Sequence, residues 1–261
     1  MTMRVDKILA SNGYGSRKDV RVFLKKNNCC INGVRCINPA QHIDPTKDTF
    51  TVNGISVQLR TSVYIMLHKP AGCVSSTKDP IHKTVMDFLP APFNAMDLFP
   101  IGRLDIDTEG LLIITNDGNL THSITAPKSN CVKTYYLELE RPLTETEIHN
   151  FTEKLAQGIL LHTGYTCLPA ALELTENIHT KNAQAFLIHI TEGKYHQIKK
   201  MCTAFGVKLT YLKRVSMAGL ELDPSLAAGN CRELTSEEIT LLYRNAAAHK
   251  SKQKLTPDLK Q

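Results

Sequence analysis

The sequence contains no tryptophan and no stretch of 18 consecutive apolar residues. A helix that crosses a membrane needs about 20 predominantly apolar residues, so the sequence predicts no membrane span. Residues 1–13, MTMRVDKILASNG, also lack the sustained apolar segment and the small-residue cleavage site of a signal peptide. We therefore expect a cytoplasmic protein.

The sequence has eight cysteines, but no two of them form a C-x-x-C pair. Zinc sites and disulfide frameworks use characteristic short spacings, which this scattered distribution does not reproduce. We expect reduced thiols, as is usual in the cytoplasm. Because no other metal-ligand constellation is visible either, the sequence predicts no metal site.

Positive charge is concentrated at the two ends of the chain. The net charge of the whole sequence is +6, and residues 1–60 alone carry a net +6. Residues 61–243 carry −4 and residues 244–261 carry +4. A basic segment beside a mildly acidic one suggests a polyanionic partner, although a merely solvated basic surface is the alternative. We call residues 1–60 the head and residues 61–243 the body, and we predict a disordered basic tail at 244–261.

The sequence of the head predicts two helices followed by two hairpins. Apolar residues at helical spacing indicate a helix over Arg4 to Asn12. A second helix is predicted to begin at Ser16, which forms a capping box with Asp19, and to end near Asn27. Asn-Gly pairs at 32–33 and 53–54 predict hairpin turns between short strands. At 100° per residue, the second helix gathers four basic side chains on one face, a pattern that suits phosphate contacts: Arg17, Lys18, Arg21 and Lys25.

The body mixes helices and strands without a regular βαβ alternation. Strands are predicted at 64–67, 111–115, 133–140, 184–191, 207–212 and 217–222, and helices at 120–126, 144–157, 193–206 and from 235. This order indicates an α+β fold with a largely antiparallel sheet. In the strand KTYYLELE, alternation predicts that Tyr135 points inward and Tyr136 outward. Tyr195 is assigned to the apolar side of the helix at 193–206.

Two carboxylates lie in a predicted loop between buried elements. Asp105 and Asp107 follow an apolar approach and precede the apolar run from Leu111 to Thr115. Loops on rigid scaffolds often carry catalytic groups, but such residues also stabilise turns. Two acids at i and i+2 could also form a glycosidase-like pair. The absence of tryptophan, which would provide a sugar-binding platform, argues against that reading.

Four motifs in the body occur in the order typical of one enzyme family. They are LHKPAG at 67–72, GRLDIDTEGL at 102–111, KTY at 133–135 and EGKYHQIKKM at 192–201, with a weaker match at LKR 212–214. Through them the body resembles the pseudouridine synthases, in particular the branch that modifies bacterial ribosomal RNA. The head carries RVDKILA, SRKDVR and INGV, and it resembles the S4-like RNA-binding module.

This resemblance implies a reaction and roles for four residues. The reaction detaches uracil from its ribose, turns it and rejoins it through C5, without a cofactor. Asp105 matches the aspartate that acts on a flipped nucleotide, by attacking sugar or base or by removing a ribose proton. Lys199 matches the cation that keeps it ionised, and Tyr135 the tyrosine that lies against the target base. Arg103 is expected to contact RNA phosphate or to help flip the base, whereas Asp107 has no general role.

The resemblance also implies a partner, which is ribosomal RNA or a ribosomal subunit precursor. The most similar branch acts on 16S rRNA, but enzymes acting on 23S rRNA share every motif. A non-catalytic assembly factor is a further alternative, which the intact Asp105, Tyr135 and Lys199 disfavour. We expect a monomer.

Overall fold

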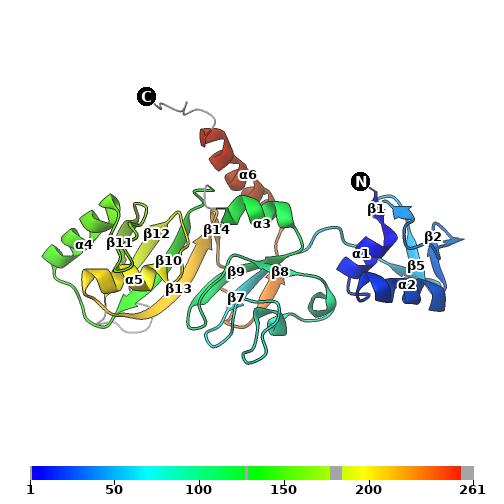
Figure 1. Ribbon diagram of the computed structural model, residues 1–261, viewed down its shortest axis with the longest axis horizontal. Coiled ribbons are helices and arrows are strands. Elements are labelled where there is room, and N and C mark those ends of the chain that lie inside the picture. The colour runs from blue at the N-terminus through cyan, green and yellow to red at the C-terminus, as the bar shows by residue number, and fades with distance from the viewer. Residues whose placement is uncertain (1, 127–128, 177–183, 254–261) are drawn as a thin grey trace.

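The computed structural model describes residues 2–126, 129–176 and 184–253 and shows an elongated molecule with the head at one end (Figure 1). In the head, α1 (Val5–Ser11) and α2 (Arg17–Lys26) pack on a sheet of order β3-β2-β5-β6. These strands are β2 (Cys29–Ile31), β3 (Val34–Arg35), β5 (Phe50–Val52) and β6 (Ile55–Val57), and β1 (Met3–Arg4) pairs with β4 (His42–Ile43). The head has a hydrophobic core of its own.

The local signals read from the head sequence are confirmed. The Ser16 hydroxyl accepts from the backbone of Asp19, and the Asp19 carboxylate accepts from the backbone of Ser16, which completes the capping box of α2. Both Asn-Gly turns have positive φ at both residues, 51° and 80° at Asn32 and Gly33. Such turns match the twist of a hairpin and favour asparagine and glycine.

The body is built on a nine-stranded sheet of order β11-β12-β10-β13-β9-β7-β15, with β8 and β14 paired to β9 and β13. The bounds are β7 (Tyr64–Lys69), β8 (Phe99–Ile101), β9 (Glu109–Thr115), β10 (Lys133–Leu139), β11 (Ala171–Thr175), β12 (Ala185–Ile190), β13 (Leu209–Met217), β14 (Leu220–Glu221) and β15 (Cys231–Glu233). This mixed and largely antiparallel architecture confirms the predicted α+β class.

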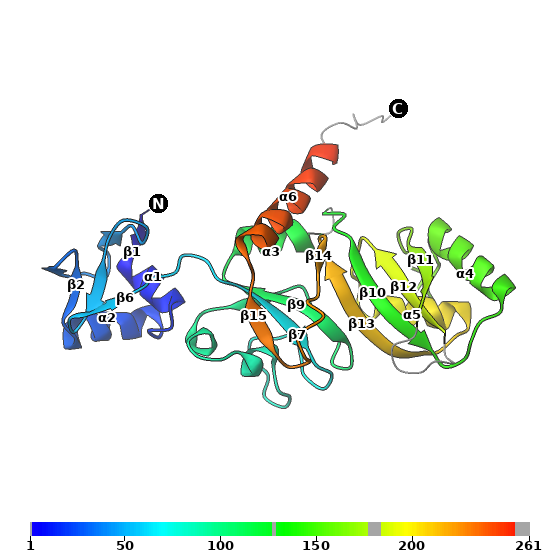
Figure 2. The ribbon, with the colours of Figure 1, turned by 180° about the vertical axis from the view of Figure 1, so that it is seen from behind.

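The two halves of the sheet meet at one short parallel pairing. Only two residue pairs connect β9 and β13, Glu109 with Lys213 and Gly110 with Arg214. A Cβ atom at Gly110 would lie 2.2 Å from the carbonyl oxygen of Arg214, so a side chain here would push the strands apart. Glycine at position 110 therefore lets β9 and β13 approach closely enough to join the two halves of the sheet. Figure 2 shows the two halves from behind.

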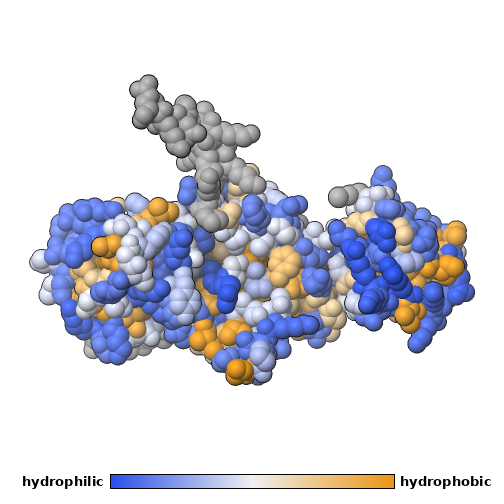
Figure 3. Space-filling view, viewed as in Figure 1, coloured by the Kyte–Doolittle hydropathy of each residue, from blue (hydrophilic) through white to orange (hydrophobic). Residues whose placement is uncertain are grey.

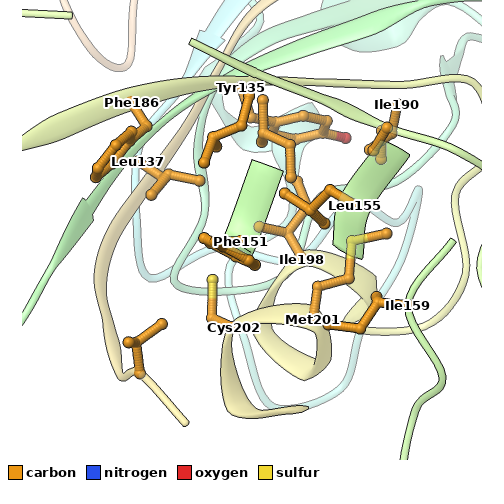
Figure 4. Packing of buried hydrophobic residues seen from close by; sticks show 14 of the residues in the cluster. Tyr135, Leu137, Phe151, Leu155, Ile159, Phe186, Ile190, Ile198, Met201 and Cys202 are labelled. Carbon is orange, nitrogen blue, oxygen red and sulfur yellow. The ribbon is translucent and has the colours of Figure 1, made fainter. Parts of the chain in front are cut away.

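Helices cover the two halves separately. α4 (Glu145–Gln157) and α5 (Gln197–Phe205) pack on β10 and its neighbours in a core cluster that includes Tyr135, Phe151, Ile198 and Met201 (Figure 4). α3 (Gly118–Thr125) and α6 (Ser236–Gln253) pack on the other half. Two 3-10 helices, η1 (Val85–Phe88) and η2 (Phe93–Ala95), lie in the segment before β8. Among the described residues, no helix is long and apolar enough to cross a membrane.

Three predictions about the body are wrong. α5 begins at Gln197 rather than at Gly193, because His196 has a φ of 53°, which a right-handed helix cannot contain. Tyr195 precedes the helix and is 74% exposed, so it is not part of the apolar face. Tyr136 does lie on the other face from Tyr135 but is only 4% exposed, because it packs edge-on against Tyr211 and donates to Glu138 at 2.6 Å.

The predicted tail is wrong for residues 244–253. α6 continues to Gln253, and Ala246 is buried in the core cluster of α3 and α6. The side-chain amide of Asn245 donates to the carbonyl of Ala218 at 2.8 Å. The apolar face of the last helix therefore extends into the segment that composition alone marked as a tail. Residues 254–261 lie outside the described residues.

Candidate active site

The loop at 102–108 lies between β8 and β9, where the two halves of the sheet meet. Lys69, at the end of β7, is fully buried beneath this loop. Its ammonium group donates to the carbonyl oxygens of Thr108 at 2.8 Å and Asp105 at 3.0 Å, and more weakly to that of Ile106 at 3.4 Å. Burial lowers the pKa of Lys69. A buried cation that is bonded to three carbonyls of one loop fixes the shape of that loop.

Ser75 fastens the same loop from the other side. Its hydroxyl donates to the carbonyl of Leu104 at 2.9 Å and accepts from the backbone N–H of Leu104 at 3.0 Å. The backbone N–H of Gly72 donates to the carbonyl of Ile106 at 2.7 Å. The loop that carries Asp105 is thus rigid on both sides of the carboxylate.

Asp105 faces two basic side chains from the start of α5. Lys199 Nζ lies 3.4 Å from Oδ2 of Asp105, and His196 Nε2 lies 3.5 Å from Oδ1. The Asp105 side chain is 25% exposed, so substrate can reach it. The structure therefore brings the predicted pair Asp105 and Lys199 together, and it adds His196, whose role sequence reasoning did not identify.

Lys199 is bonded more closely to Asp107 than to Asp105. Its ammonium donates to the two carboxylate oxygens of Asp107 at 2.6 and 2.8 Å. Burial lowers the pKa of Lys199, but the hydrogen bonds to Asp107 and the charge of Asp105 outweigh it and raise the pKa overall. For Asp107, burial acts in the other direction and raises the pKa. The hydrogen bond from Lys199 outweighs burial, so the pKa of Asp107 is lowered overall. Asp107 thus positions the lysine, a role that turn chemistry did not suggest.

The same geometry argues against a glycosidase-like pair. A glycosidase needs one of its two acids to be protonated at working pH, which requires a raised pKa. Here an ammonium group lies between the two carboxylates and the pKa of Asp107 is lowered. The lowered pKa favours Asp107 as an anion rather than as the acid of such a pair.

Tyr135 lines the same small cavity as Asp105, Arg103, His196 and Lys199. It lies on β10 and is 7% exposed, with its ring packed into the core cluster of Figure 4. A rigid aromatic ring beside a carboxylate offers a flat surface against which a nucleobase can lie. Arg103 is exposed at the entrance of the cavity.

The four basic residues predicted on the head, Arg17, Lys18, Arg21 and Lys25, are all exposed on α2. In Figure 3, hydrophilic residues cover much of the surface of the head around this helix. They lie on a different domain from the catalytic loop, so contact with RNA there stays a prediction.

Lys69 is the main structural residue of the site that sequence reasoning missed. The predicted strand at 64–67 ends before it, although it lies inside the motif LHKPAG at 67–72. A charged residue that closely follows an apolar strand is a signal that it has a buried partner. Among the described residues, no three His, Cys, Asp or Glu side chains are placed to hold a metal ion.

Comparisons with known proteins show which family the chain belongs to. A sequence model of the family described as RNA pseudouridylate synthase matches residues 63–204. An uncharacterized RNA pseudouridine synthase of Bacillus subtilis is 42% identical over 92% of this chain and 98% of its own length. The ribosomal small subunit pseudouridine synthase A of Escherichia coli K12 is 37% identical over 91% of this chain and 98% of its own. A crystal structure of a pseudouridylate synthase superposes with a TM-score of 0.62 at 34% identity, covering 92% of this chain and 99% of that one. The chain therefore belongs to the RNA pseudouridine synthase family, and it is an enzyme that isomerises uridine to pseudouridine in RNA.

Proposed function

We propose that the protein forms pseudouridine at a specific site of 16S ribosomal RNA, with Asp105 as the acting carboxylate. The observation that carries this proposal is the placement of Asp105 on a rigid loop, 3.4 Å from Lys199 and in one cavity with Tyr135. The relative in Escherichia coli whose name specifies the small subunit matches almost the full length of the chain. Such a match over both head and body supports a shared target.

Each residue of the site has its own role in the reaction. The bond between N1 of uracil and C1′ of ribose breaks, a bond between C5 and C1′ forms, the proton on C5 leaves and N1 takes up a proton. Asp105 acts next to this centre, and the ammonium group of Lys199, 3.4 Å away, offers an opposite charge to its carboxylate. Tyr135 lies against the base, and Arg103 contacts the strand at the entrance. Extruding a base costs a few kcal/mol, and the basic groups around the cavity offset that cost.

The partner is ribosomal RNA or an assembling small subunit, bound in part through the exposed basic face of α2. One chain supplies all the site residues, which is consistent with a monomer. The eight free thiols are consistent with the cytoplasm.

The experiment is carbodiimide labelling of rRNA, which marks pseudouridine as a stop of reverse transcription. The rRNA comes from cells lacking the protein and from the same cells supplied with wild type or with Asp105→Asn. We expect one stop in 16S rRNA to disappear and to return only with wild type. Loss of a stop in 23S rRNA instead would replace the proposed target, and loss of none would refute an rRNA target.

A further inference from the structure

A second cavity of about 270 Å³ lies next to the catalytic one. Both cavities are lined by Arg103, Tyr135 and Lys194, so they adjoin. The second cavity continues along β10 and β13 to Lys133 and Arg214. Its volume is several times that of one water molecule in the liquid, which leaves room for a polar group of the substrate.

Strand register brings two cations to the wall of this cavity. Arg214 on β13 is paired with Tyr135 on β10, and Met217 is paired with Lys133, with a bulge between them. Side chains two residues apart on a strand share a face, so Lys133 and Arg214 point to the same side as Tyr135. Arg214 is only 2% exposed, which makes it one of the largest fully buried side chains of the body.

Neither cation forms an ion pair within the part of the chain that the structure describes. Arg214 donates from Nε to the carbonyl of Leu111 at 2.8 Å, and its buried Nη2 has no hydrogen-bond partner. Lys133 Nζ donates to the carbonyl of Cys131 at 2.8 Å and lies 3.5 Å from that of Thr191. Burial lowers the pKa of Lys133, and the more distant charge of Glu192 does not outweigh it.

The carboxylate of Glu192, which lines the cavity, already accepts three hydrogen bonds. Glu192 accepts from the hydroxyl of Tyr165 at 2.6 Å, from the backbone of Leu168 at 2.9 Å and from the amide of Gln197 at 2.6 Å. It therefore fastens the loop before α5 and forms no ion pair with either cation among the described residues. Buried charges are costly unless they are paired, so two unpaired cations indicate that an anion completes them when substrate binds.

We propose that this cavity binds a phosphate group of the substrate RNA strand directly next to the flipped uridine. The inference rests on the proposed function, since it takes the cavity at Asp105 as the place of that uridine. RNA carries one phosphate per nucleotide, so a flipped uridine brings a phosphate to the neighbouring cavity. Guanidinium groups recognise phosphate oxygens through paired, charge-assisted hydrogen bonds. The exposed side chains of Arg103 and Lys194 continue the positive path to the surface.

The test uses the full-length enzyme and a short RNA that contains the mapped uridine. In separate substrates, one phosphodiester at a time around this uridine is replaced by an uncharged methylphosphonate, and KM and kcat are measured. We expect one linkage next to the uridine to raise the KM of wild type at least tenfold, with a much smaller change in kcat. A structural role of Lys133 and Arg214 alone would produce no such dependence on one linkage.

Variants then connect the linkage to the cavity. In Lys133→Gln and Arg214→Gln, the same replacement should raise KM less than threefold, because part of the charge that meets the phosphate is gone. Arg214→Lys keeps the charge and should keep the sensitivity, as should Lys154→Gln, which removes an exposed charge on α4. If thermal unfolding shows that Arg214→Gln does not fold, the wild-type scan and Lys133→Gln decide.

Two outcomes would overturn the proposal: no single linkage affects the wild-type KM, or one linkage affects wild type and both Gln variants equally. These outcomes are distinct from failure of the proposed function. If the proposed function fails, wild type forms no pseudouridine in any rRNA, whichever linkage is intact.

Discussion

Lys199 connects the two carboxylates of the catalytic loop. It is held at 2.6 Å by Asp107 and lies at 3.4 Å from Asp105, so a short movement of the ammonium group exchanges one partner for the other. Lys199→Met should reduce turnover at least a hundredfold, because the positive charge 3.4 Å from the Asp105 carboxylate would be lost. Lys199→Arg should retain part of the activity. Release of tritium from rRNA labelled at C5 of uridine measures both, and a fully active Met variant would contradict the assignment.

Asp107 should be less important for turnover than Asp105. Its carboxylate is 64% exposed and bonds only through Lys199 in the described structure. Asp107→Asn keeps an oxygen that can accept from Lys199, so we expect less than a tenfold loss in the same assay. A loss as large as that of Asp105→Asn would show that Asp107 takes part in the chemistry.

The pair of Asp107 and Lys199 also predicts a pH dependence of stability. The pKa of Asp107 is lowered, so its contribution to folding is present above its ordinary pKa near 4 and is lost as the pH falls further. The pKa of Lys199 is raised, so its contribution is present below about pH 10 and is lost above it. The difference in unfolding free energy between wild type and Asp107→Asn should thus be constant from about pH 6 to 9. A difference that changes within this window in urea titrations would contradict the pairing.

At the level of elements, the catalytic loop depends on a lysine that belongs to the preceding strand. Lys69→Met keeps the apolar stem but leaves the carbonyl of Thr108 without its donor, whereas that of Asp105 still accepts from the backbone N–H of Thr108. One unsatisfied buried carbonyl costs about 1–3 kcal/mol, so we expect urea unfolding to show a loss of about 1–3 kcal/mol, together with a large loss of activity. Full activity in a stable variant would show that the loop holds its shape without Lys69.

Sequence signals predicted the elements well where the signal and the contacts that it reports both lie within a few residues. The capping box at Ser16 placed the start of α2 correctly, and the predicted helix at 144–157 agrees with α4, because caps such as those at Thr144 and Gly158 satisfy backbone groups within a few residues. Among the site residues, the pairing of Asp105 with Lys199 was predicted only through the family motifs. Nothing in spacing alone connects a loop with a helix about ninety residues later.

The errors arise from contacts between distant segments. The left-handed conformation at His196 delays α5, and it follows a loop that Glu192 holds through Tyr165 and Leu168. Tyr136 was expected to face solvent because its neighbours on that face are polar, but its hydroxyl donates to Glu138 and its ring packs against Tyr211 of the adjacent strand. Periodicity reports which residues share a face, and it does not report whether another layer covers that face.

For the whole molecule, separate cores in head and body predict that the two can be separated. The head cluster shares no residue with the body clusters, although Arg60 forms an ion pair with Glu233 across the boundary. A chain starting at Ser62 should therefore fold and keep the catalytic loop in place, but it should bind rRNA more weakly. Each lost phosphate contact reduces the slope of log affinity against log salt by about 0.7–0.9, so the four basic residues of α2 account for a reduction of up to about 3.

A salt titration of rRNA binding compares full-length protein, the chain from Ser62, and full-length protein with Arg17, Lys18, Arg21 and Lys25 all changed to alanine. The two altered proteins should show similarly shallow slopes. Equal slopes for all three would assign the phosphate contacts to the body and would show that the four basic residues of α2 make none.

The central claim is that Asp105 performs the isomerisation on bound RNA, and one paired measurement tests it most directly. Pseudouridine formation and RNA affinity are measured for wild type and for Asp105→Asn on the same rRNA under the same conditions. The geometry predicts that the variant binds within about threefold of wild type but forms no measurable pseudouridine, because the rigid loop stays while the carboxylate is lost. Turnover of Asp105→Asn within tenfold of wild type would contradict the account.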